Sequence, residues 1–199
     1  MNAILARRVA LIWLPFATTV VCIRSRRFDD WEHAVSRHMN RLPDALHRPV
    51  WVAMQAGTLG APAVAGGAAL LAGRPTLAGR FIQSGFSAYL LAKAVKRVVR
   101  RGRPADLIVG IHVRGRPASG DGYVSGHAAV SMALATEAAL ALKAGARPVP
   151  YTAACVVALA RLYVGAHLPM DALGGAALGW AVSRTASELR RPLQLAQST

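Results

Sequence analysis

The sequence predicts an all-α polytopic membrane protein with six transmembrane helices and an interfacial amphipathic helix between the first two. The chain has 199 residues and is 54% hydrophobic, yet its formal charge is +15. These two properties are separated along the chain. Apolar residues form runs close to the roughly 20 residues that cross a hydrocarbon core, and Arg and Lys cluster between the runs. The length and the absence of linkers favour a single domain over residues 1–199.

The six apolar runs are expected to be helices, because helices satisfy their own backbone hydrogen bonds in lipid. Small residues recur in them, as in GTLGAPAVAGGAA and GGAALG, and allow helices to approach closely. The third run is weakened by Arg80 and Lys93. In chain order the runs cover 9–23, 50–73, 77–95, 125–142, 149–164 and 168–182.

The first run is expected to be a retained helix rather than a cleaved signal peptide. The residues after Cys22 read IRSRR and contain no small-residue cleavage site. Cys22 and Cys155 both lie in apolar runs and lack metal-ligand spacing. We therefore interpret them as packing residues.

The loop 24–49 contains an amphipathic pattern. Its apolar residues recur at three- or four-residue steps, and Asp, Glu, His and Arg fall on the opposite face. This favours a helix lying at the membrane interface; the alternative is a solvated loop with one packed tryptophan. The apolar residues are Phe28, Trp31, Val35, Met39 and Leu42.

Alternating helix directions place the loops 24–49, 96–123 and 165–168 on one face. The first polar cluster on this face is KRVVRRGRP, which begins at Lys96 and ends with Arg103 and Pro104. By itself, a basic run beside a membrane helix usually anchors anionic headgroups. That interpretation applies best to its three other cations, Arg97, Arg100 and Arg101.

The second cluster is Ser125, Gly126 and His127, at the start of the fourth apolar run. Backbone N–H groups at a helix start favour an anion, Ser125 adds a hydroxyl, and a neighbouring histidine can protonate a leaving oxygen. The simpler alternative is that Ser125 only caps the helix and His127 is satisfied by a neighbour.

The third cluster, ARLYVGAHLPMDA, contains Arg161, His167 and Asp171. Pro169 suits the first turn of a helix. The four-residue step allows Asp171 to accept a hydrogen bond from Nδ1–H of His167, which leaves Nε2 as a nucleophile. The alternative is a purely structural His–Asp pair.

Together, the clusters predict one headgroup-level pocket with several cations, helix-start N–H groups and two histidines. Such a pocket can align a phosphate and stabilise charge during phosphoryl transfer. No cluster of carboxylates suits Mg²⁺, since only Asp106, Asp121 and Asp171 are near. We expect no metal and no cofactor.

These residues resemble the type 2 phosphatidic acid phosphatase (PAP2) superfamily of membrane lipid phosphatases. The family pattern is Lys, six residues, Arg-Pro; then Pro-Ser-Gly-His; then Ser-Arg, five residues, His, three residues, Asp. Lys96, Arg103, Ser125-Gly126-His127, Arg161, His167 and Asp171 match it within 96–171. Val124 replaces the usual proline and Ala160 the usual serine, which we expect to tune the rate or the substrate choice.

The resemblance implies a two-step mechanism through a phosphohistidine. His167 is the nucleophile, Asp171 orients it, and His127 protonates the departing lipid oxygen. The phosphate would be held by Lys96, Arg103, Ser125, Gly126 and Arg161.

The implied partners are a lipid phosphate substrate and membrane lipids in a bacterial plasma membrane, and no nucleic acid. The substrate is a polyprenyl phosphate or diphosphate, or a phospholipid phosphate; no feature indicates the oligomeric state. Positive charge near the site favours the cytoplasmic face, whereas related enzymes open outward. The alternatives are a non-enzymatic binder or transporter of anionic lipids and an activity like that of vanadate haloperoxidases.

Overall fold

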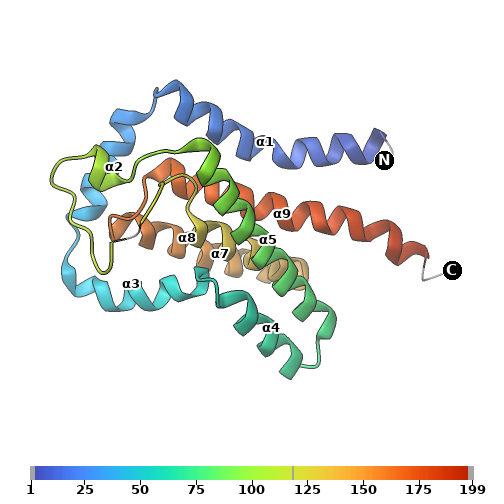
Figure 1. Cartoon of the computed structure of the whole chain (residues 1–199). Coiled ribbons are helices and arrows are strands. Elements are labelled where there is room, and N and C mark those ends of the chain that lie inside the picture. The colour runs from blue at the N-terminus through green and yellow to red at the C-terminus, as the bar shows by residue number, and fades with distance from the viewer. Residues whose placement is uncertain (1–2, 118, 197–199) are drawn as a thin grey trace.

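The computed structural model describes residues 3–117 and 119–196, and these residues form helices joined by turns and loops without a strand (Figure 1). Short 3-10 turns cover Asp44–Leu46, Gln55–Gly57 and Ala144–Ala146. The helices are α1 (Ala3–Ser25), α2 (Asp29–Asn40), α3 (His47–Met54), α4 (Ala61–Leu71), α5 (Pro75–Val99), α6 (Pro104–Leu107), α7 (Gly126–Leu140), α8 (Pro148–Tyr163) and α9 (Pro169–Ala196).

The second apolar run is not one helix, contrary to the prediction. It is broken into α3, a 3-10 turn and α4. The turn packs against α7 and α8 at Gly57, where a Cβ atom would lie 2.6 Å from the carbonyl oxygen of His127 and 2.9 Å from Cγ1 of Val157. At this break, the backbone of the second run lies directly against the start of α7.

The count of six spanning helices is therefore not confirmed. By length and composition, α1 is the one helix among the described residues that could cross a membrane, and α4 is apolar but shorter. The helices α7 and α8 have 15 and 16 residues. At a rise of 1.5 Å per residue, each is shorter than a full hydrocarbon core of about 30 Å.

The core of the bundle forms around α7, which packs against α5, α8 and α9, while α1 lies along α9 (Figure 1). The sequence GGAALG in α9 allows direct contact with α7. A Cβ atom at Gly175 would clash with the carbonyl oxygen of Ser125, and one at Gly179 with that of Ala129. The predicted close approach at small residues is thus confirmed for this helix pair.

The helix predicted within 24–49 is α2, so the alternative of a loop is wrong. Its buried side chains include polar ones that the amphipathic pattern did not indicate as buried. Glu32, Ser36 and Asn40 share one face and are buried against the bundle, whereas Phe28 and Trp31 remain exposed. The inward side of α2 therefore combines these polar residues with Met39, which packs against the core.

The two cysteines are both free. Cys22 is partly buried, which agrees with a packing role. Cys155 is exposed on α8, so it does not pack in the core of the bundle.

Arg114 holds together the three loops that were predicted to share one face. Its guanidinium donates to the carbonyl oxygens of Asn40 and Leu42 at 2.9 Å, to that of Tyr163 at 2.9 Å, and to a carboxylate oxygen of Asp44 at 2.7 Å. The loops after α1, α5 and α8 therefore meet, as the alternation of helix directions indicated.

The close packing of α7 on α9 leads us to predict how a larger residue at this contact changes the stability of the protein. Gly179→Ala would force the two backbones apart and lower the free energy of unfolding by about 1–3 kcal/mol. Gly79→Ala is the matched control, because no atom lies within 4 Å of its added Cβ and Ala favours a helix. Thermal unfolding of both variants in detergent should show a lower Tm for the first alone; equal Tm values would contradict the packing.

Candidate active site

The site begins at the amino terminus of α7. Ser125 is the N-cap residue, and its Oγ accepts a hydrogen bond of 3.4 Å from the backbone N–H of Ala128. The Ser125 residue is fully buried, whereas His127 in the first turn is only partly buried. The structure thus supports the capping interpretation of Ser125, and His127 is not fully buried.

A backbone hydrogen bond joins this helix start to that of α9. The N–H of Ser125 donates to the carbonyl oxygen of Asp171 at 2.8 Å. Pro169 is the first residue of α9, as predicted, and His167 lies in the turn just before it. The second and third sequence clusters are therefore neighbours in space.

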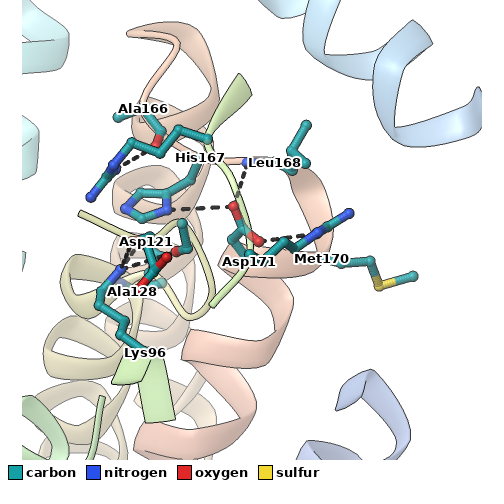
Figure 2. A network of polar contacts seen from close by, with 12 residues as sticks. Lys96, Asp121, Ala128, Ala166, His167, Leu168, Met170 and Asp171 are labelled. Carbon is teal, nitrogen blue, oxygen red and sulfur yellow. Dashed lines mark hydrogen bonds and ion pairs between the residues drawn. The ribbon is translucent and has the colours of Figure 1, made fainter. Parts of the chain in front are cut away.

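His167 and Asp171 face each other as predicted, but at a longer distance (Figure 2). Nδ1 of His167 lies 3.6 Å from Oδ2 of Asp171, which is too long for a hydrogen bond. The same Oδ2 accepts a hydrogen bond of 2.9 Å from the backbone N–H of Leu168. Within the described residues Nδ1 has no closer polar partner, so Asp171 is the group that faces it.

Two of the predicted phosphate-binding cations are engaged with loop carbonyls. Nζ of Lys96 donates to the carbonyl oxygens of Asp121 at 2.7 Å and Gly122 at 3.0 Å (Figure 2). Arg103 donates to the carbonyl oxygens of Ser119, Gly120 and Ala166 at 2.7–3.1 Å. Both side chains therefore shape the loops around the site, and each keeps N–H groups beyond those used in these bonds.

Arg161 is bound much less completely. Its Nη1 contacts Sδ of Met54 at 3.3 Å, and its buried Nε has no hydrogen-bond partner among the described residues. An unpaired buried donor of this kind is costly, which suits a group that receives an anion.

Several charged groups lie near His127 and Arg161. Lys96, Arg161 and His167 are close enough to His127 to interact with it electrostatically, and Arg103 interacts in the same way with Arg161. The described residues contain no group of three His, Cys, Asp or Glu side chains suited to a metal ion.

Sequence reasoning missed the partner of Asp171 on its other side. Nη1 of Arg101 donates to Oδ1 of Asp171 at 3.0 Å, and the same guanidinium forms a bidentate pair with Glu32 of α2. Arg101 had been interpreted as a headgroup anchor, but its side chain is only 14% exposed. No spacing in the sequence connects Glu32 to this cluster, because the contact forms across the fold.

Burial dominates the electrostatics of His167. It lowers the pKa of the imidazole to about 4, although Asp171 acts in the opposite direction. Burial also disfavours the charged guanidinium of Arg101, but its bonds to Glu32 and Asp171 outweigh this effect and raise its pKa. At neutral pH His167 is therefore an uncharged base beside a carboxylate that Arg101 neutralises.

Residues 78–193 match the family model described as the PAP2 superfamily. The chain belongs to the PAP2 superfamily. This confirms the resemblance inferred from the three motifs, all of which lie within the matched segment. No curated protein matches the sequence significantly.

Two solved structures share the fold of this chain. One is described as the first transmembrane PAP2 type phosphatidylglycerolphosphate phosphatase from Bacillus subtilis; it has a TM-score of 0.76 at 18% identity, over 92% of this chain and 96% of that one. The other is Aquifex aeolicus LpxE, with a TM-score of 0.70 at 19% identity over 79% and 93%. This PAP2 chain thus has the same fold as these two proteins, the first of which is described as transmembrane.

The low pKa of His167 can be measured directly. Its imidazole should titrate with a midpoint near 4, well below the ordinary value of about 6.5, because burial disfavours its charged form. Histidine-labelled protein in detergent, followed by NMR against pH and assigned with His167→Gln, gives this midpoint. A midpoint at or above 6.5 would contradict the buried, neutral imidazole.

Proposed function

We propose that this PAP2 protein is a metal-independent phosphatase that hydrolyses a membrane lipid phosphate or diphosphate through a phosphohistidine. The observation that carries the proposal is the joining of two histidine-bearing helix starts by the Ser125–Asp171 backbone hydrogen bond. A nucleophile and a proton donor on two sides of one phosphate are what such a displacement requires.

In the first step, Nε2 of His167 attacks phosphorus in line with the leaving lipid oxygen. An N–P bond forms and the P–O bond to the lipid breaks. Protonated His127 gives its proton to the departing oxygen, which leaves as the lipid alcohol, or as the lipid monophosphate when the substrate is a diphosphate. Asp171 faces Nδ1 and stabilises the positive charge that develops on the ring.

In the second step, the now neutral His127 takes a proton from water, and the resulting hydroxide attacks phosphorus. The N–P bond breaks, inorganic phosphate leaves, and His167 is restored. During both steps the equatorial oxygens carry charge that fixed cations and N–H donors stabilise.

Arg161 is the best-placed cation for this task, because its Nε is buried and unpaired. Lys96 and Arg103 add charge from the loops they hold, and the Gly126 N–H points from the start of α7. Ser125 joins the cage only if its buried Oγ becomes accessible, so we assign it the capping role first.

A lipid substrate fits a reaction centre at the end of apolar helices. Large apolar side chains are exposed around the bundle, as at Val64 and Leu71 of α4, which are 74% and 94% exposed. Such surfaces suit contact with acyl or prenyl chains. We place the protein in a bacterial plasma membrane, with the six apolar runs embedded and α2 at the interface, where the exposed Trp31 is favoured.

The rival function is a binder or transporter of anionic lipids, and it differs in one respect. A binder needs the cations but not a neutral histidine held beside a carboxylate. Phosphate release from a defined lipid by the purified protein separates the two, and a halide-oxidation assay with added vanadate tests the haloperoxidase alternative.

The nucleophile is tested by His167→Ala. Release of phosphate from a panel of phospholipid and polyprenyl phosphates should fall by at least about 1000-fold, because the covalent route is lost. His38→Ala is the matched control, since His38 is exposed on α2, and it should retain full activity. A His167→Ala protein that folds and still turns over at the parent rate would remove this residue from the nucleophilic role.

Metal independence is tested separately. With a saturating chelator of divalent cations, the rate of phosphate release should change by less than about twofold, because fixed cations supply the charge that a metal would supply. Complete loss of activity, restored by adding Mg²⁺ or Zn²⁺, would contradict the proposed chemistry.

A further inference from the structure

A chain of buried charges reaches from α2 to the proposed nucleophile. Both carboxylate oxygens of Glu32 accept hydrogen bonds from the guanidinium of Arg101, and the Nη1 of Arg101 also donates to Oδ1 of Asp171 at 3.0 Å. Glu32 and Asp171 are 1% and 0% exposed. The mechanism above makes no use of Glu32 or Arg101.

The same carboxylate also holds the backbone that follows the nucleophile. Oε1 of Glu32 accepts a hydrogen bond of 2.8 Å from the N–H of Met170, in the first turn of α9. That N–H lies at a helix start, where it has no partner within its own helix. Glu32 thus fixes the start of α9 directly, and it fixes Asp171 through Arg101.

We propose that Glu32 and Arg101 are positioning residues for the phosphohistidine chemistry, acting on His167 through Asp171. This inference rests on the proposed function. Oδ1 of Asp171 is held by Arg101 and Oδ2 by the Leu168 N–H, so the carboxylate has one orientation, with Oδ2 toward Nδ1 of His167. The direction of Nε2 toward phosphorus follows from that orientation.

Arg101 also controls how strongly Asp171 acts on the imidazole. The charged and titratable groups facing His167 are Asp171 itself on α9, Lys96 on α5, Arg161 on α8 and His127 on α7. Arg101 adds a cation on the far side of Asp171. Removing that cation leaves the carboxylate charge uncompensated, which favours the protonated imidazole and raises the pKa of His167.

A role in folding alone is the competing explanation. Breaking a buried ion pair leaves an unpaired charge and is strongly destabilising, so a loss of activity by itself cannot distinguish the two explanations. A folding defect lowers the amount of active enzyme at every pH. A positioning defect lowers kcat with little change in KM and moves the acid limb of the pH–rate profile.

The experiment compares Arg101→Gln, Arg101→Lys, Glu32→Gln and the double variant E32Q/R101Q, each purified in detergent and assayed for phosphate release. Arg97→Gln, a neighbouring exposed cation, is the control and should behave as the parent protein. Arg101→Gln should reduce kcat about 10- to 100-fold, because small misplacements of a reacting group have effects of this size. Arg101→Lys should recover part of that loss.

The acid limb of kcat/KM should move upward by about one pH unit in Arg101→Gln. The double variant should be little worse than the poorer single variant, because Glu32 and Arg101 act as one unit. Unchanged kcat and pH profile in both single variants would overturn the inference, as would a uniform loss at every pH without a shift. Failure of the proposed function gives a different result from failure of this inference. In that case the parent protein would release phosphate no faster than the His167→Ala variant.

Discussion

The site depends on the backbone contact between α7 and α9. The Ser125 N–H bonds the Asp171 carbonyl, and Gly175 brings the two backbones together where any larger residue would meet the Ser125 carbonyl oxygen. This contact fixes the relative position of two helix starts that lie more than forty residues apart. The other groups are arranged around that pair: Lys96 and Arg103 hold the loop before α7, and Arg161 lies in the last turn of α8.

Much of this arrangement can be predicted from the sequence, because the groups that carry it have local signals. Motif spacing identified His127, His167 and Asp171, and helix alternation predicted that their loops meet. The break in the second apolar run coincides with Gly57, Gly60 and Pro62, which are residues typical of a helix boundary, but its packing of Gly57 against the His127 carbonyl oxygen forms only in the assembled bundle. Side-chain partners are equally non-local. The spacing that predicted a His167–Asp171 hydrogen bond could not show that Asp171 also accepts from Leu168 and Arg101.

The orientation of α2 connects the exposed surface of the bundle to the proposed active site. Its apolar residues Phe28 and Trp31 remain exposed, while Glu32 is buried with full hydrogen bonding to Arg101 and Met170. A carboxylate is buried in this way only when it is paired, because desolvating an isolated charge is very costly. The ion pair therefore ties α2 to the start of α9, and the pattern that identified an amphipathic helix did not indicate that Glu32, Ser36 and Asn40 turn inward.

The central claim, that the two helix starts form one phosphate site with His167 as nucleophile, is tested most directly by trapping the intermediate. Purified protein is mixed with a lipid substrate labelled in the transferred phosphate, quenched within milliseconds under alkaline conditions, digested and mapped by mass spectrometry. The account predicts an acid-labile, alkali-stable phosphate on His167, and no such label when His167 is replaced by Gln. Label on another residue, or full turnover with no label on His167, would contradict it.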